Sequence, residues 1–352
     1  MKILHTGDIH LREYEDERWK ALKSLIEIGK KERVDIFIIA GDLFDKGVSA
    51  EHLRGKIRGL FSNLVFKIYL LPGNHDKDAY KHGLNFGNDV KILRQEPCDI
   101  ETIRIIGLPF EEIGAEDILE KINSLKTKLR KDGKNILIFH GELLDTFYSR
   151  TDFGEEGDKR YMPVRLKYFE DLNIDYILAG HFHTNFDVRE LKNGCYFVYP
   201  GSPISITKRE TGGRMINIFE VDHPPSEYHL DTPYFEDVEI ELDPFKDEKP
   251  IEKLKEELKT LPKNAKILLK VKGYYNARSI GLNETMLIEK IKEICIDRSG
   301  GEPVLEFRDI QTILEDDLFK EFLKKLNGKD YDGTMQKEMR NIAIKAMMEE
   351  MS

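Results

Sequence analysis

Residues 34–45 read Val-Asp-Ile-Phe-Ile-Ile-Ala-Gly-Asp-Leu-Phe-Asp, an apolar run that ends in Gly41-Asp42 and, three residues later, Asp45. The run lacks the two-residue alternation of a half-exposed strand, so it predicts a strand covered on both faces. A glycine after such a strand permits a sharp backbone turn. In open α/β sheets, ligands bind outside the carboxyl ends of the strands. This stretch therefore predicts an α/β domain with an acidic site at the end of the strand.

The same pattern recurs along the first 210 residues. Further short apolar runs predict buried strands at residues 3–4, 67–71, 103–108, 135–139, 175–179 and 196–199. Helical spacing of apolar residues over 17–31, 51–64 and 118–129 predicts helices between some of them. Four of the other strands end in motifs of similar composition: Asp8-Ile9-His10, Gly73-Asn74-His75-Asp76, His140-Gly141 and Gly180-His181-Phe182-His183. Five strand ends are thus expected to deliver Asp, Asn and His to one edge of a sheet.

These side chains predict a metal centre. Five of the ten histidines fall at these strand ends, and a purely structural network of that many imidazoles would be hard to satisfy without cations. Mixed carboxylate and imidazole ligands suit manganese, iron or zinc. The cysteines Cys98, Cys195 and Cys295 are isolated, which excludes a structural thiolate zinc site. The candidate ligands exceed the needs of one octahedral ion, so two ions are expected, with Asp42 between them. The candidates are Asp8, His10, Asp42, Asn74, His140, His181 and His183.

The five motifs, in this order, resemble those of the calcineurin-like metallophosphoesterases. The resemblance implies an α/β fold, a layered β-sandwich flanked by helices. It implies one metal held by Asp8, His10, Asp42 and His183 and a second held by Asp42, Asn74, His140 and His181. Two such ions clamp a phosphate and activate water for in-line attack. His75 resembles the family's general acid for the leaving alkoxide, and Asp45 would hold its imidazole or, alternatively, cap a helix.

A narrower resemblance concerns the substrate. Lys2–Leu11, Gly41–Phe44 and Tyr199–Ser202 resemble the SbcD type of double-strand-break repair nuclease, the meiotic recombination eleven family. This implies a manganese-dependent 3′-to-5′ exonuclease and single-strand endonuclease acting on DNA. Two positions depart from that family, with Arg12 where glycine is usual and Asp45 where many members have histidine. The alternatives are a small-molecule phosphodiesterase or phosphatase of the same superfamily, or a non-catalytic scaffold.

The chain beyond the motifs predicts further parts. Residues 1–222 would form the nuclease domain, His223–Ser226 a linker, and residues 235–300 a small α+β capping domain. Residues 301–352 would form helices that, by the resemblance, dock on an SMC-like ATPase of the SbcC type. Packing of these helices on their own domain is the alternative. The resemblance also implies a homodimer through helices near 51–64 and 78–90, although the apolar stripe of Leu53, Ile57, Leu60 and Phe61 equally fits an ordinary core.

DNA binding requires local cations, because the net charge is −10 and nucleic-acid binders are more often basic. The candidates beside the motifs are Arg12, Lys159, Arg160, Arg165, Lys167, Lys208, Arg209 and Arg214. Tyr148 and Phe153 would stack on an unpaired base or pack within their loop. No run approaches the ~18 apolar residues of a membrane span. The N-terminus turns polar early and the cysteines are isolated, so a cytoplasmic location is expected.

Overall fold

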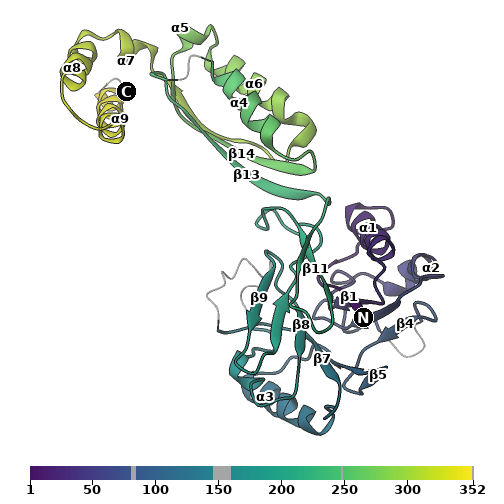
Figure 1. Ribbon diagram of the computed structural model, residues 1–352. Coiled ribbons are helices and arrows are strands. Elements are labelled where there is room, and N and C mark those ends of the chain that lie inside the picture. The colour runs from purple at the N-terminus through teal and green to yellow at the C-terminus, as the bar shows by residue number, and fades with distance from the viewer. Residues whose placement is uncertain (81–84, 146–159, 247–248, 351–352) are drawn as a thin grey trace. The chain divides into compact units, whose positions relative to one another are not determined.

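The computed structural model describes residues 1–80, 85–145, 160–246 and 249–350, and it divides into two compact units, residues 1–235 and 236–352 (Figure 1). The first unit contains two six-stranded sheets and the second a three-stranded sheet. The five motifs all belong to the first unit, so its two sheets determine where the candidate site lies.

The first sheet is built around parallel strands from the N-terminal part of the chain. Its order is β12-β11-β1-β2-β3-β4, with β1 to β4 parallel and β11 antiparallel to both β1 and β12. The strands are β1 (Lys2–Thr6), β2 (Ile36–Ala40), β3 (Lys67–Leu71), β4 (Val90–Ile92), β11 (Met215–Glu220) and β12 (Glu227–His229).

The second sheet also has a parallel centre, but both of its edge strands pair antiparallel with their neighbours. Its order is β5-β6-β7-β8-β10-β9, in which β6, β7, β8 and β10 are parallel. The strands are β5 (Cys98–Ile100), β6 (Ile103–Leu108), β7 (Lys134–His140), β8 (Tyr176–Gly180), β9 (Asp187–Glu190) and β10 (Tyr196–Tyr199).

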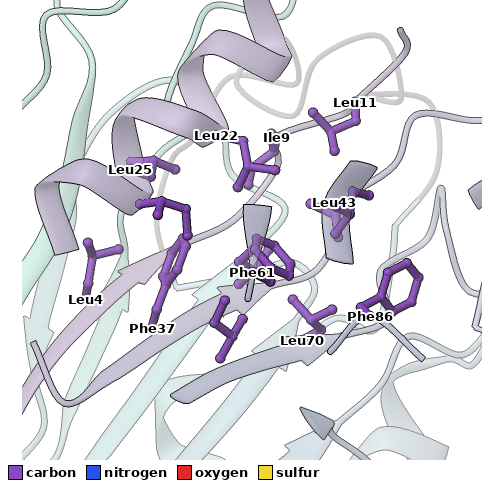
Figure 2. Packing of buried hydrophobic residues seen from close by; sticks show 14 of the residues in the cluster. Leu4, Ile9, Leu11, Leu22, Leu25, Phe37, Leu43, Phe61, Leu70 and Phe86 are labelled. Carbon is purple, nitrogen blue, oxygen red and sulfur yellow. The ribbon is translucent and has the colours of Figure 1, made fainter. Parts of the chain in front are cut away.

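Alternate side chains of each central strand point to opposite faces of its sheet and pack in different cores. One of these cores lies between the two sheets and holds them face to face. Phe37 of β2 packs with Leu22 and Leu25 of α1 (Glu17–Glu32) in the cluster that Figure 2 shows. On the opposite face, Ile36 and Ile38 of β2 pack with residues of the second sheet. The outer face of that sheet packs on α3 (Ala115–Ser124). The layers are therefore helix, sheet, sheet and helix, which confirms the expected helix-flanked sandwich.

The placement of the motifs corrects one expectation. The strands that carry them are shared between the sheets, with β1, β2 and β3 in the first and β7 and β8 in the second. The expectation that all five strand ends lie at one edge of a single sheet was therefore wrong. Because β2 contacts both β7 and β8 across the interface between the sheets, the carboxyl ends of the five strands still meet.

The second unit is a small α+β body with its own core. Its sheet has the order β13-β14-β15, and α4 and α6 cover one face through a cluster that includes Leu254, Leu287 and Val271. Three more helices pack around Phe319 and Ile344. The elements are β13 (Tyr234–Leu242), α4 (Pro250–Thr260), β14 (Ala265–Tyr275), α5 (Ala277–Ile280), α6 (Glu284–Cys295), β15 (Val304–Asp309), α7 (Gln311–Glu315), α8 (Asp317–Asn327) and α9 (Gly333–Glu350).

Three sequence-based expectations differ from this arrangement. The residues expected as a linker, 223–226, instead lie between β11 and β12, which pair in the first sheet. The tail expected to be helical from residue 301 begins with β15, which pairs with β14. The apolar stripe of α2 (Ala50–Leu60), proposed for a homodimer, packs into the core of its own unit, because Leu53, Ile57 and Phe61 are buried there. Among the described residues, no helix is both long and apolar enough to cross a membrane.

Candidate metal centre

The loops after β1 and β2 lie side by side and are joined by backbone hydrogen bonds beyond the ends of the strands. The amide of Asp8 donates to the carbonyl of Gly41 at 3.1 Å, and the amide of His10 donates to the carbonyl of Asp42 at 2.9 Å. The Leu11 amide continues the pattern to Leu43 at 2.9 Å. This pairing holds the first two motifs side by side, so their polar side chains converge.

The backbone at the site adopts conformations that most residues avoid. Asp8, His10, Asp42 and His181 have φ angles of 56°, 52°, 52° and 91°. For residues other than glycine, the left-handed region costs about 1–2 kcal/mol per residue, and such strain persists only where the surroundings impose it. Four of the ten described non-glycine residues with positive φ are thus expected metal ligands.

Two motif glycines are required by close approach of neighbouring chain segments. Gly41 has a φ of 99°, and a Cβ there would lie 2.0 Å from Nδ1 of His140. At Gly180 a Cβ would lie 2.0 Å from the carbonyl oxygen of Ala40. These glycines therefore let the ends of β2, β7 and β8 approach one another across the two sheets.

One cluster of expected ligands comprises Asp8, His10 and His183. Nitrogen and carboxylate oxygen atoms of the three side chains lie within 4.8 Å of one another, and all three are buried. Nε2 of His183 lies 3.5 Å from Oδ1 of Asp8. The backbone amide of His181 donates to both Asp8 oxygens, at 3.1 and 3.0 Å. The carboxylate of Asp8 is thus anchored from the last motif and faces two imidazoles.

A second cluster surrounds Asp42 and His140. Nε2 of His140 lies 3.3 Å from Oδ2 of Asp42 and 2.8 Å from the side-chain oxygen of Asn74. Nδ1 of His140 bonds to the carbonyl of Ala40 at 2.8 Å, which fixes the ring. The ring of His181 lies 5.3 Å from that of His140. Oδ2 of Asp42 is also 3.8 Å from Nε2 of His10. The structure thus brings all seven expected ligands together, with Asp42 between the two clusters.

The polar atoms at the centre fit divalent cations. Both ring nitrogens of His10 and Oδ2 of Asp42 are buried without a hydrogen-bond partner in the described part of the chain. Burial would lower the pKa of His183, but the Glu210 and Asp8 carboxylates outweigh it and raise the pKa to about 10. Burial also opposes the charge of His140, whose pKa Asp42 nevertheless raises to about 9. The carboxylates thus favour positive charge at His140 and His183, whereas burial lowers the pKa of His10 and lowers that of His181 to about 3. These oxygen and nitrogen donors suit manganese, iron or zinc.

Asp45 lies beside the two clusters and contacts two motif histidines. Its Oδ1 lies 3.4 Å from Nδ1 of His75 and 3.5 Å from Nδ1 of His10. Burial would raise the pKa of Asp45, but the neighbouring side chains of His10, His75 and Arg12 hold it far below the usual range. The alternative role as a helix cap is wrong, because α2 begins at Ala50 and its N-cap residue is Ser49.

Two arginines hold Asp45 from the other side. Arg12 donates from Nε to Oδ2 of Asp45, so the two positions that depart from the nuclease family pattern form an ion pair. Arg18 of α1 donates to the same oxygen at 2.9 Å and to the carbonyl of His10 at 2.6 Å. Sequence reasoning missed Arg18. Its signal was a cation on the apolar face of the helix, four residues before Leu22 and seven before Leu25.

A cleft of about 850 Å³ opens beside Asn74 and His75. Its lining is part cationic, with Lys46, Lys77 and Arg160, and part aromatic, with Phe110 and Tyr161. The buried Glu142 binds Nη1 of Arg160 at 2.9 Å and so anchors that guanidinium beside the cleft. Acidic side chains, including Glu111 and Glu112, also line the cleft. The volume lies within the ~300–1,000 Å³ of typical small-molecule sites.

The other expected DNA contacts are dispersed. Lys208 and Arg209 are exposed, and Arg165 is half-exposed and lies 3.9 Å from Asp145. Arg214 was wrongly included, because only 1% of it is exposed and it donates to backbone oxygens inside the unit. Lys159, Tyr148 and Phe153 lie outside the described residues.

The fold and the site define a class of protein: the chain belongs to the calcineurin-like phosphoesterase family, whose model matches residues 1–185. It is accordingly a metal-dependent hydrolase of phosphoesters, for which the clustered Asp and His residues supply candidate ligands to divalent ions.

Among particular relatives, the chain is 26% identical over 235 residues to the DNA double-strand break repair protein Mre11 of Saccharolobus solfataricus. That match covers 60% of this chain and 57% of the relative, so the chain spans little more than half of the relative's length. Among solved structures, TT1561 of Thermus thermophilus is 14% identical, with a TM-score of 0.44 over 61% of this chain and 92% of that one. A dimetal phosphatase from Danio rerio is 10% identical, with a TM-score of 0.39 over 62% of this chain and 91% of that one.

Proposed function

We propose that the protein is a manganese-dependent, two-metal DNA nuclease of double-strand-break repair, with 3′-to-5′ exonuclease and single-strand endonuclease activity. The observation that carries the proposal is the convergence of all seven expected ligands on Asp42, beside a cleft that His75 lines. The similarity to a DNA repair protein over 235 residues supports DNA as the substrate.

The residues divide into two ligand sets in this proposal. Asp8, His10 and His183 would hold one ion with Asp42, and Asn74, His140 and His181 would hold the second with the same Asp42. When bound, two divalent ions polarise the phosphate and lower the pKa of a water molecule. The strained backbone at Asp8, His10, Asp42 and His181 pre-sets the ligands for this task.

His75 is the proposed general acid. It lines the cleft, and its Nδ1 faces the carboxylate of Asp45 at 3.4 Å. Asp45 orients the imidazole, while Arg12 and Arg18 hold Asp45 in place. His75 can then donate a proton, or a hydrogen bond, to the leaving oxygen of the scissile phosphodiester. Such general acid catalysis contributes typically ~10²–10⁴-fold to a rate.

Substrate binding is assigned to the cleft and its neighbourhood. Arg160, anchored by Glu142, can pair with a backbone phosphate, and the partly exposed ring of Tyr161, which lies 5.5 Å from that of the buried Phe110, gives a base an aromatic surface. Lys159, Arg165, Lys208, Arg209 and the outer part of Arg12, whose side chain is 62% exposed, are further proposed DNA contacts. Because the whole chain is acidic, these local cations carry the interaction with DNA.

The second unit supplies the proposed accessory parts. Residues 235–300 would act as a capping domain and residues 301–352 as the docking segment for an SMC-like ATPase of the SbcC type. Three apolar side chains of the terminal helices support this docking segment, because Leu318 is 71% exposed, Met335 44% and Ile342 68%. Exposed apolar side chains on neighbouring helices suit a partner helix.

The test is a nuclease assay of the full chain on end-labelled single- and double-stranded DNA. Manganese is compared with magnesium and with a chelator, and Asp8→Ala serves as the inactive control. Manganese-dependent degradation by the parent, absent from the variant, is the expected result. Hydrolysis of a generic phosphodiester without cleavage of either DNA, with and without the ATPase partner, would contradict the nuclease and assign the site to a small-molecule phosphodiesterase or phosphatase.

A further inference from the structure

A buried carboxylate outside the five motifs faces one of the proposed metal ligands. Glu210 lies in the segment between β10 and β11 and is 0% exposed, although the preceding residues Lys208 and Arg209 are on the surface. Its Oε1 lies 3.2 Å from Nδ1 of His183. The other ring nitrogen of His183, Nε2, lies 3.5 Å from Asp8. The imidazole of His183 is therefore placed between Glu210 and the proposed metal site.

The carboxylate of Glu210 is fixed by its own loop. The amide of Ile206 donates to Oε2 at 2.7 Å, and the amide and hydroxyl of Thr207 each donate to Oε1 at 3.2 Å. The hydroxyl of Ser202 lies 3.4 Å from Oε2. Because these donors hold both oxygens, the position of Glu210 does not depend on His183. The carboxylate can thus set the orientation of the imidazole.

The same segment also holds the backbone of His183. The amide of Ser202 donates to the carbonyl of His183 at 2.9 Å, and the buried Arg214 donates to that carbonyl as well. Arg214 is fixed in turn by the carbonyl of Ser202 at 3.0 Å and by its hydroxyl at 2.9 Å. Residues 202–214 therefore position His183 at two points, its ring and its main chain.

We propose that Glu210 is a positioning residue of the metal centre, which accepts a hydrogen bond from Nδ1 of His183 and so directs the lone pair of Nε2 toward the ion beside Asp8. The inference rests on the proposed metal site and assigns a role within it to a residue outside the motifs. A neutral imidazole has one N–H and one lone pair, so a partner on Nδ1 decides which nitrogen is left for the metal. Removing such a carboxylate partner typically lowers metal affinity ~10–100-fold.

A purely structural role makes a different prediction. Glu210 could serve only as the counter-charge to the buried Arg214 and as an acceptor for its loop. Its replacement would then lower thermal stability without a selective effect on one metal site. Metal affinity separates the two roles, because His183 belongs to only one of the two ligand sets.

The experiment is isothermal titration of the metal-free full chain with Mn²⁺. The parent is expected to bind two ions, Glu210→Gln to bind one of them ~10–100-fold more weakly, and the control Glu220→Gln, at an exposed position of β11, to match the parent. In a His183→Ala background, Glu210→Gln is expected to cause no further loss. Equal losses in both backgrounds, or parent-like affinity in the single variant, would overturn the proposal.

A second variant keeps the proposal testable if Glu210→Gln folds poorly. Glu210→Asp keeps the charge but withdraws the carboxylate from Nδ1 by one methylene, so we expect the same selective loss, and parent-like affinity would overturn the proposal. This outcome can be distinguished from a failure of the metal centre itself. If the metal centre does not exist, the parent chain binds no Mn²⁺, and the proposed function is then refuted before the role of Glu210 is tested.

Discussion

Gly41 combines two constraints that can be separated by a matched pair of substitutions. Its φ is 99° and a Cβ would meet His140, whereas Gly47 has a φ of 77° and open space around it. We expect Gly47→Ala to cost only the ~1–2 kcal/mol of backbone strain. Gly41→Ala should cost more in the free energy of unfolding and should also weaken Mn²⁺ binding, because it displaces His140. Urea unfolding and metal titration measure both, and equal effects of the two substitutions would show that the contact with His140 is unimportant.

His75 can be tested as a proton donor rather than a metal ligand. We predict that His75→Ser binds both ions with parent-like affinity and loses at least ~10²-fold in turnover. The control is His52→Ser, because His52 is an exposed histidine of α2. Turnover on labelled DNA and metal content by mass spectrometry are the two measurements. Loss of one ion from the His75 variant would make this residue a ligand and remove the proposed acid from the mechanism.

Cys195 provides a pH-dependent prediction away from the site. Burial raises the pKa of its thiol to about 12 from an ordinary value of 9.0. Between these values only the unfolded chain releases the proton, so this residue lowers the free energy of unfolding as the pH rises through that range. The reactive form is the thiolate. Native protein at pH ~8.5 should therefore resist iodoacetamide at Cys195 until urea unfolds it, as peptide mass spectrometry would show. Rapid labelling of the native chain would contradict the burial argument.

At the residue scale, the sequence identified the site residues that belong to a recurring pattern, an apolar run followed by Asp, Asn or His. Asp8, His10, Asp42 and the other expected ligands could be named because each follows an apolar run and a glycine lies close to most of them. Glu210 carried no such signal, because it stands next to two surface cations and outside the five motifs. The burial of Arg214 was also unpredictable, since only the tertiary fold places the Ser202 and His183 carbonyls around it.

At the scale of single elements, α1 shows how local signals fix a helix end. The side chain of Asp16 accepts a hydrogen bond from the Trp19 amide at 2.7 Å, while Ser49 at the start of α2 makes no such cap bond. We expect Asp16→Ala to lower the free energy of unfolding by about 1 kcal/mol and Ser49→Ala to have a much smaller effect. Chemical denaturation of the two variants tests this. A larger loss for Ser49→Ala would refute the assignment of the caps.

The expected strands were recovered where both faces are buried. β2, β3 and β8 match the apolar runs to within two residues, because burial on two sides leaves a continuous apolar signature. β4, β5 and β12 were missed, since each has only three residues and lies at a sheet edge. The edge strand β9 and the six-residue β11, which lies inside the first sheet, were missed as well. The division of the central strands between two sheets also left no local trace, because a strand buried by a helix and one buried by another sheet look alike.

At the scale of the whole molecule, the chain holds separate cores. Among the described residues, the three buried clusters of the first unit draw only on residues before 236, and the two clusters of the second unit only on residues after it. All seven expected metal ligands belong to the first unit. Metal binding should therefore raise the stability of the first unit only, and this should be visible in the thermal unfolding of the full chain.

Calorimetry of the full chain tests whether metal stabilises the first unit only. Separate cores predict two unfolding transitions, and a ligand that binds only the folded first unit raises its stability by ~2.7 kcal/mol at a free concentration 100 times its dissociation constant. For a unit of this size the corresponding shift is roughly 5–11 °C. We expect Mn²⁺ to raise one transition, chelation to reverse the shift, and Asp8→Ala to abolish it. The same rise in a chain of residues 1–235 would identify the responsive unit. A single transition for the full chain, raised as a whole by Mn²⁺, would mean that the units unfold as one cooperative body, and the independence of their cores would be refuted.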